Sequence, residues 1–147
     1  MKTNMKVLIV DDEIFNLDIM SYHLEGAGFE VVQAEDGVVA LQKLASEAGI
    51  SVIILDRRMP RMDGMAVLER IKENPALNNI PVIMQTAASD YEQISVISLE
   101  GTYGYLTKPY EGEELVNLVR VAMRDSKQAA QTACAAQGKG QKPAQSR

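Results

Sequence analysis

The sequence predicts an α/β fold in which a five-stranded parallel sheet carries helices on both faces. Short aliphatic runs alternate with segments whose apolar residues recur at helical spacing, and this pair of patterns occurs five times. The spacing is near the ~30 residues of a strand-helix-strand unit. The most apolar run, Val52–Leu55, has four consecutive branched aliphatic residues, which is typical of a strand buried on both faces. Right-handed crossovers then place helices on both sides of the sheet.

Each predicted strand is a short aliphatic run that ends at charged, hydroxyl or turn-forming residues. We expect the strands at Lys6–Val10, Phe29–Ala34, Val52–Leu55, Pro81–Gln85 and Gly104–Leu106.

Each predicted helix follows one of these runs and has an apolar stripe. The first stripe ends before two glycines, the second follows an Asp-Gly turn, and the third ends at an Asn-Pro pair. The fourth helix is the weakest, because it contains several β-branched residues. The predicted helices begin at about Ile14, span 38–48, 65–73 and 90–100, and begin at Glu113. The residues expected to face inward are, in the first helix, Ile14, Leu17, Met20 and Leu24, and, in the second, Val38, Leu41, Leu44, Ala45 and Ala48. In the third they are Leu68 and Ile71, and in the last Leu115, Leu118, Val119 and Ala122.

Composition limits the classes of function. The 147 residues suffice for one domain with a sizeable core, and 46% apolar with 24% charged residues is ordinary globular composition. A net charge of −5 argues against direct nucleic-acid binding by this domain. The single cysteine, Cys134, permits no internal disulfide. The apolar start is too short for a signal peptide, and no run approaches the ~18 residues of a membrane span, so we expect a cytoplasmic protein without membrane contact.

Polar residues of complementary chemistry follow four of the predicted strands. Asp11 and Asp12 follow the first strand, Asp56 the third, Thr86 the fourth and Lys108 the fifth. In parallel sheets the carboxyl ends of the strands share one edge, where ligand sites collect. One acid at a strand end is commonly a turn cap, but a set from four strands is not explained by packing. An unperturbed Asp has a pKa of about 3.9, so we expect Asp56 to be an ionised oxygen nucleophile at pH 7.

Five separated motifs carry a family resemblance: VLIVDDE, EDG at 35–37, LDRRMPRMDG, QTA at 85–87 and YLTKP at 105–109. In this order and spacing they are specific, and from about Lys6 to Arg124 the chain resembles the receiver domains of bacterial response regulators, in particular stand-alone chemotaxis-type receivers. The resemblance implies a flavodoxin-like, doubly wound (βα)5 fold with strand order 2-1-3-4-5.

The resemblance also implies the site. Asp56 is the phospho-acceptor, and Mg²⁺ is the cofactor. Asp12, Asp56 and the backbone carbonyl of Arg58 bind the metal directly, and Asp11 holds a metal-bound water. A hard cation with oxygen ligands would offset the repulsion between Asp56 and an anionic phosphoryl group.

The remaining family residues bind the phosphoryl group and transmit its presence. Lys108 pairs with a phosphoryl oxygen, and Thr86, followed by Ala87, binds another. Tyr105 is the aromatic switch on the fifth strand, and a cis peptide precedes Pro109. The chain would catalyse its own Mg²⁺-dependent phosphorylation and dephosphorylation, without being an enzyme on other substrates.

The resulting hypothesis is a single-domain response regulator, with a receiver at residues 1–125 and an Ala/Gln/Lys-rich tail at 126–147 that is partly a helical extension or disordered. Its phosphohistidine donor would be a sensor histidine kinase or a histidine phosphotransfer protein. Its output would be a target protein bound at the face of helix 4, strand 5 and helix 5. His23, the only histidine, has polar neighbours, so we expect a solvated side chain and no phosphodonor in the chain itself.

Three alternatives stay open. The chain could be the receiver part of a larger regulator with a DNA-binding or enzymatic output domain. A phosphohydrolase with an Asp nucleophile commonly has a second acid two residues later, where this chain has Arg58. A flavin-binding module of this fold would need a hydroxyl- and glycine-rich loop after the first strand, where this chain has three acids, Asp11 to Glu13.

Overall fold

The computed structural model describes residues 5–57, 64–87 and 102–137. The strands are β1 (Lys6–Val10), β2 (Glu30–Ala34), β3 (Ile50–Asp56), β4 (Val82–Ala87) and β5 (Gly104–Lys108). The helices are α1 (Ile14–Gly26), α2 (Gly37–Ser46), α3 (Gly64–Glu73) and α5 (Gly112–Gln137). The helix predicted at 90–100 lies outside the described residues. Within the described ranges, none of the helices has the length and apolarity needed to span a bilayer.

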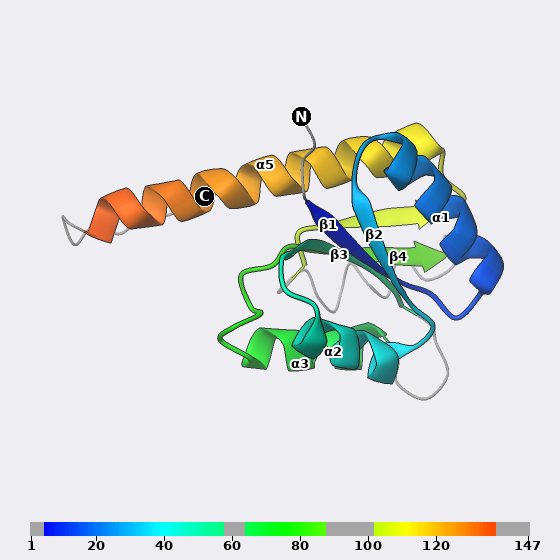
Figure 1. The fold of residues 1–147 in the computed structure, drawn as a ribbon, viewed down its shortest axis with the longest axis horizontal. Helices are drawn as coiled ribbons and strands as arrows, with labels where there is room; N and C mark the ends of the chain where they lie inside the picture. Colours follow the sequence, from blue (N-terminus) through cyan, green and yellow to red (C-terminus); the bar gives the residue numbers. More distant parts are fainter. Residues whose placement is uncertain (1–4, 58–63, 88–101, 138–147) are drawn as a thin grey trace.

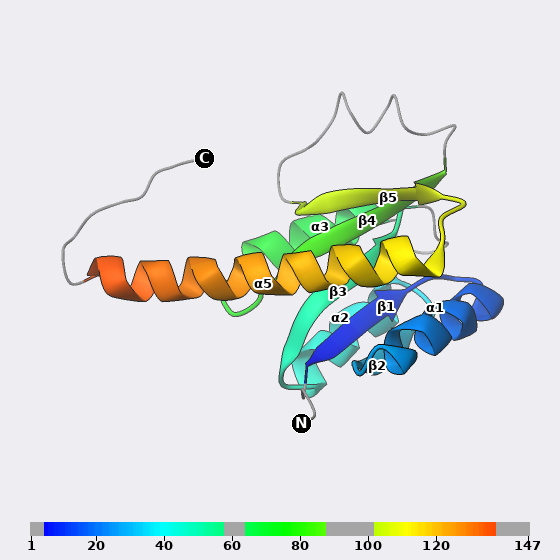
Figure 2. The same ribbon diagram turned by 90° about the horizontal axis from the view of Figure 1, so that it is seen from above.

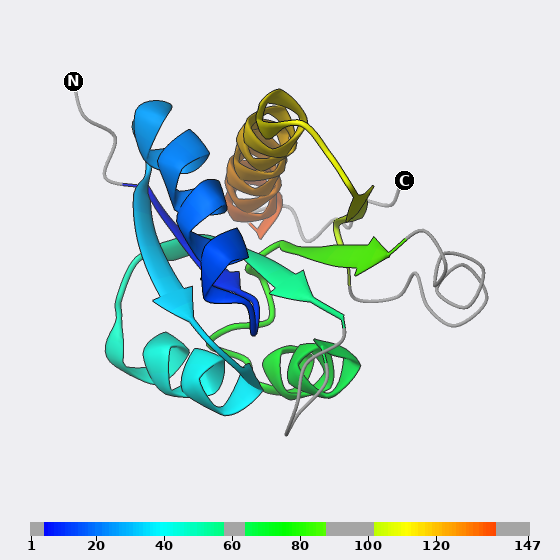
Figure 3. The same ribbon diagram turned by 90° about the vertical axis from the view of Figure 1, so that its right-hand side faces the viewer.

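The sheet confirms the predicted fold class. All four strand pairs are parallel, and the order is β2-β1-β3-β4-β5. Figure 1 shows the strands between two layers of helices, and Figure 3 shows α1 and α5 on one face with α2 and α3 on the other. The fold is therefore a doubly wound flavodoxin-like sheet, as the motifs implied.

Alternation along the strands divides the core into two layers. Ile9, Ile54 and Ile83 face α1 and α5, where they pack with buried residues such as Leu17 and Leu115. Their chain neighbours face α2 and α3 and form the second cluster, which includes Leu8, Val10, Ile53, Leu55, Met84, Leu44 and Ile71. Because successive side chains point to opposite faces, this alternation also determines which face each strand-end residue occupies.

Two predicted apolar stripes were wrong in part. Ile14, at the start of α1, is 57% exposed, whereas Leu17, Met20 and Leu24 are buried as expected. In α2, Leu44 is buried as expected, but Val38 is 38% exposed and Ala45 and Ala48 are exposed too. The helix buries Gly37 and Ala40 in their place, and it ends at Ser46. Ile14 and Val38 lie in the first turn of their helix, at the end of the sheet where the chain has just left a strand. α1 therefore buries the predicted face except at its exposed first residue, whereas α2 is rotated relative to the stripe that its sequence suggests.

The environment of His23 also differs from the prediction of a solvated side chain. The ring is partly buried, makes an edge-on contact with Tyr22, and lies against Gly112 at the start of α5. A Cβ atom on Gly112 would collide with the imidazole ring. The absence of a side chain at Gly112 therefore lets α1 and α5 approach closely.

α5 is a single helix of 26 residues. Its first turns pack on the sheet through Leu115, Val119 and Ala122, and Figure 2 shows its later turns continuing past the sheet. Tyr103, just before β5, donates a hydrogen bond from its hydroxyl to Asp125 Oδ2 at 2.6 Å. The helix thus continues through residue 125, where the sequence suggested the end of the domain.

Candidate functional site

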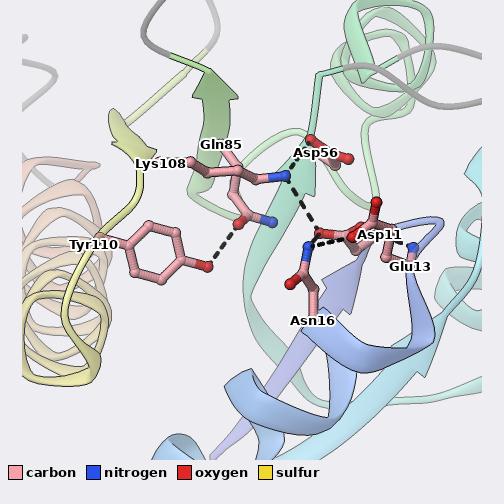
Figure 4. A network of polar contacts seen from close by, with 7 residues as sticks. All are labelled: Asp11, Glu13, Asn16, Asp56, Gln85, Lys108 and Tyr110. Carbon is pink, nitrogen blue, oxygen red and sulfur yellow. Dashed lines mark hydrogen bonds and ion pairs between the residues drawn. The ribbon is translucent and has the colours of Figure 1, made fainter.

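Two buried carboxylates lie side by side at the carboxyl edge of the sheet (Figure 4). Asp56 is the last residue of β3 and is 6% exposed, and Asp11 directly follows β1 and is 0% exposed. The register pairs Val10 with Leu55, so the two acids occupy neighbouring positions on adjacent strands. By alternation, both are on the face covered by α1 and α5. Asp12, the third acid of the group, is exposed.

Asp11 is held by the turn that leads into α1. Its Oδ1 accepts a hydrogen bond from the backbone N–H of Glu13 at 2.9 Å, and its Oδ2 accepts one from Asn16 Nδ2 at 3.4 Å. Its own backbone N–H donates to the carbonyl of Ala34 on β2 at 3.1 Å. Buried carboxylates need such donors, because desolvation without them is costly. The loop therefore fixes the orientation of this carboxylate.

Lys108 brings a positive charge to the two acids from the end of β5. Its Nζ lies 3.3 Å from Asp56 Oδ1 and 3.6 Å from Asp11 Oδ2. Partial burial lowers the pKa of Lys108, but the carboxylates of Asp56 and Asp11 outweigh burial, so the pKa is raised overall. Lys108 is therefore an ammonium ion at neutral pH.

The carboxyl group of Asp56 is harder to ionise than an ordinary aspartate. Burial and the neighbouring charge of Asp11 raise its pKa from 3.8 to about 6, although Lys108 lowers it. This correction to the expected ordinary pKa has a physical cause: the carboxylate is removed from water beside a second negative charge. At pH 7 Asp56 is still mainly ionised and can serve as an oxygen nucleophile.

The acidic group has the chemistry of a divalent-cation site. Asp11, Asp12 and Asp56 each offer a carboxylate oxygen, and these atoms lie within 4.8 Å of one another. Carboxylate oxygens are the ligands that Mg²⁺ prefers, and Mg²⁺ usually keeps several waters, for which the exposed side at Asp12 leaves access. The donor set therefore fits the magnesium ion that the sequence predicts. Arg58, whose carbonyl was predicted as a further ligand, lies outside the described residues.

The predicted switch residues lie on β4 and β5, the two strands that follow β3 across the sheet. Thr86 is 1% exposed near the end of β4, which extends to Ala87 rather than ending at Gln85. The register pairs Ala87 with Lys108. Tyr105, on β5, is half-buried and packs against the core cluster on the α2 and α3 side. The Lys108–Pro109 peptide bond is cis.

A glycine brings the start of α3 close to the end of β3. The backbone N–H of Gly64 donates to the carbonyl of Arg57 at 2.9 Å. A Cβ atom on Gly64 would collide with the backbone carbonyl oxygen of Asp56 and would lie 2.9 Å from the Cα of Arg57. Gly64 therefore permits a close backbone contact that fixes the end of β3.

Sequence reasoning missed three polar residues around the acids. Asn16 bonds to Asp11, and the Tyr110 hydroxyl donates to Gln85 Oε1 at 2.6 Å beneath Lys108 (Figure 4). Burial, together with the charges of Asp11 and Asp56, raises the pKa of Tyr110. A signal was present in the sequence: Gln85 interrupts the apolar run of its strand, and Tyr110 directly follows the Lys-Pro pair.

With this geometry established, known proteins provide a comparison. Residues 7–120 match the family described as the response regulator receiver domain. The chain is 36% identical over 119 residues to the DNA-binding dual master transcriptional regulator RpaA of Synechocystis sp., covering 81% of this chain and 49% of that protein. It is also 36% identical over 128 residues to the alkaline phosphatase synthesis transcriptional regulatory protein PhoP of Bacillus subtilis, covering 86% and 52%. The chain thus spans about half the length of these curated relatives.

Solved structures show the same similarity. A response regulator receiver domain protein from Clostridium thermocellum superposes with a TM-score of 0.78 at 29% identity, covering 85% of this chain and 98% of that one. The chemotaxis response regulator CheY4 of Vibrio cholerae superposes with a TM-score of 0.74 at 34% identity, covering 82% and 99%.

Proposed function

The chain belongs to the response regulator receiver domain family, and from this membership we propose that Asp56 accepts a phosphoryl group from a phosphohistidine. The donor would be a sensor histidine kinase or a histidine phosphotransfer protein. In the transfer, an Asp56 carboxylate oxygen forms the new bond to phosphorus while the bond from phosphorus to the donor's imidazole nitrogen breaks. The observation that carries the proposal is the buried Asp56 carboxylate at the end of β3, flanked by Asp11 and Lys108.

A bound magnesium ion would offset the repulsion between the Asp56 carboxylate and the anionic phosphoryl group, which opposes this transfer. Asp12, Asp56 and the carbonyl of Arg58 would hold it directly, and Asp11 would hold one of its waters. The geometry of the three carboxylates supports this assignment, because their oxygens lie close enough to share one cation. Phosphoryl transfer depends mostly on positioning and charge stabilisation, which these residues can provide.

Lys108 would contribute the second positive charge. Its ammonium group contacts Asp56 and would move to a phosphoryl oxygen once Asp56 is modified. Thr86 and Ala87, at the end of β4, would bind another phosphoryl oxygen. The aspartyl phosphate is a mixed anhydride and therefore labile to water, so the same site would release its phosphate without a separate enzyme.

The output would be phosphorylation-dependent binding of a target protein. Thr86 and Tyr105 lie on the adjacent strands β4 and β5, and a change at Thr86 would alter the surface of β5, α5 and the predicted helix at 90–100. Phosphorylation can bias the position of Tyr105 only through contacts that differ between the two states. We expect Thr86→Ala to accept phosphate but to lose most of the change at Tyr105. Amide chemical shifts with Mg²⁺ and beryllofluoride measure this, and a wild-type shift pattern in the variant would contradict the coupling.

A second candidate function is the receiver part of a larger regulator. The chain covers 49% and 52% of two relatives whose names describe transcriptional regulators, so those proteins contain additional sequence of similar length. In this form, phosphorylation of Asp56 would control an output domain in the same polypeptide. A longer reading frame in the source gene would favour this candidate over a single-domain regulator.

Intact-mass measurement tests the acceptor directly. With a small-molecule phosphodonor and Mg²⁺, the wild-type chain should gain one phosphoryl group that is stable in acid and lost in base. Asp56→Asn should gain none, and Asp18→Asn, which removes an exposed acid of α1, should behave as wild type. An equal mass gain in Asp56→Asn at the same rate would overturn the assignment.

A further inference from the structure

Gln85 lies beside the acceptor in the row of side chains that forms the floor of the site. The register pairs Gln85 on β4 with Asp56 on β3, and the backbone N–H of Arg57 donates to the carbonyl of Gln85 at 3.0 Å. Gln85 follows Ile83 by two residues, as Asp56 follows Ile54, so both point to the α1 and α5 face. A neutral amide therefore occupies the strand position next to the acceptor.

The two ends of this amide have different environments. Gln85 is 0% exposed, and its Oε1 accepts the hydroxyl hydrogen bond of Tyr110 at 2.6 Å. Its Nε2 is buried and has no hydrogen-bond partner among the described residues. Figure 4 shows this nitrogen turned away from Tyr110, toward the side on which Asp11 and Asn16 lie. An amide whose oxygen is held in this way has a fixed donor direction.

Buried donors without a partner are rare, and each one calls for an explanation. In the form described, Asp11 shares the ammonium group of Lys108 with Asp56, at 3.6 and 3.3 Å. If Lys108 moves to a phosphoryl oxygen, the fully buried carboxylate of Asp11 loses this cation. Besides Asn16, which already donates to Asp11, the Gln85 amide is a neutral donor directed toward the same side (Figure 4).

We propose that Gln85 is a positioning residue for Asp11, held in place by Tyr110. In the phosphorylated, cation-bound form its Nε2 donates a hydrogen bond to the Asp11 carboxylate in place of Lys108. This bond holds the Asp11 carboxylate in the orientation in which it binds a water of the cation. The inference rests on the proposed function, because it needs Lys108 to leave Asp11 when Asp56 is modified.

The side-chain amide of Gln85 can be observed directly in the intact chain by ¹⁵N–¹H NMR. Its signals are assigned by their loss in Gln85→Met and are recorded in wild type before and after addition of Mg²⁺ and beryllofluoride, which occupies the place of the phosphoryl group. We expect one amide proton of Gln85 to shift downfield. The amide of Gln33, on the exposed edge strand β2, should not shift. If Mg²⁺ and beryllofluoride bind while the Gln85 signals stay unchanged, the inference is wrong.

Affinity measurements separate positioning from a purely structural role. Removing a partner of an outer hydrogen bond typically weakens metal binding by about 10-fold to 100-fold, so Gln85→Met should weaken the joint binding of Mg²⁺ and beryllofluoride about tenfold. Tyr110→Phe should act in the same direction, because it releases the amide. The double variant Gln85→Met/Tyr110→Phe removes both polar partners and should keep the melting temperature while binding stays weak.

Gln33→Met is the matched control and should bind as wild type. Wild-type affinity in the double variant would overturn the inference while leaving the proposed acceptor intact. A wild-type chain that binds neither Mg²⁺ nor beryllofluoride would instead overturn the proposed function, and this inference with it.

Discussion

Replacing Asp56 by asparagine should stabilise the protein at neutral pH, although it removes the proposed acceptor. Asparagine has nearly the same shape as aspartate but carries no charge to bury. Burial and the charge of Asp11 raise the pKa of Asp56 from 3.8 to about 6. This difference of about 2 pH units, at 1.36 kcal/mol per unit, corresponds to about 3 kcal/mol. Because the variant also removes the closer partner of Lys108, about 3 kcal/mol is the upper bound of the gain.

The sign of the pH dependence follows from proton binding. Between pH 3.8 and about 6 the folded state of wild type keeps a proton that the unfolded state has released. The free energy of unfolding of wild type therefore falls as the pH rises through this window, by up to about 1.4 kcal/mol per pH unit from this group. The penalty is complete above about pH 6 and absent below about pH 4. Asp56→Asn lacks this dependence, so its advantage should appear only as the pH rises.

Thermal unfolding at pH 4, 5, 6 and 7 in EDTA measures the effect without a bound cation. For a chain of this size, 1 kcal/mol corresponds to about 2–4 °C, so the variant should melt up to about 6–12 °C above wild type at pH 7. The two melting temperatures should converge at pH 4. Asp18→Asn controls for the loss of one exposed carboxylate on α1. A difference that stays constant between pH 4 and 7, or a variant that melts lower at pH 7, would refute the reasoning.

Three further substitutions test the cation site and two close approaches. Millimolar Mg²⁺ should raise the melting temperature of wild type more than that of Asp12→Ala, because a ligand stabilises the state that binds it; equal shifts would exclude this acid from the site. Gly64→Ala places a Cβ atom against the backbone carbonyl at the end of β3. We expect the free energy of unfolding, measured with denaturant, to fall by about 1–3 kcal/mol and Mg²⁺ binding to weaken. Wild-type values for both would contradict the close contact. Gly112→Ala places a Cβ atom against the ring of His23, so its free energy of unfolding should fall by a similar amount. Gly26→Ala has open space around the new Cβ atom and should unfold like wild type. Equal losses of stability in the two variants would show that the His23 ring is not the obstacle.

The sequence pattern was sufficient to predict a parallel sheet with helices on both faces because the signals are local and repeated, whereas the strand order came from the family resemblance. Each aliphatic run forms one buried strand. The carboxyl ends of parallel strands lie at the same edge of the sheet, whatever the rest of the sequence is. Asp11, Asp56 and Lys108 follow from that rule alone, and the structure brings them within ion-pair distance.

What the sequence could not provide depends on contacts between distant segments. The raised pKa of Asp56 depends on how deeply the end of β3 is buried and on the position of Asp11 at the end of the adjacent strand β1. The Gln85–Tyr110 bond joins β4 to the loop after β5 and has no periodic pattern. The exposure of Val38 and the burial of Ala40 depend on how α2 is rotated against the sheet, which its own stripe does not specify.

The length of α5 connects the site to a point well outside the sheet. The helix begins four residues after Lys108, and its 26 residues span about 39 Å at 1.5 Å per residue. Gly112 lies against His23 at the base of the helix, and the bond from Tyr103 to Asp125 holds it about halfway along. Residues 126–137 extend the helix about 18 Å beyond this bond, past the sheet (Figure 2). The helix therefore begins at the site and carries the chain away from the sheet that holds Asp56.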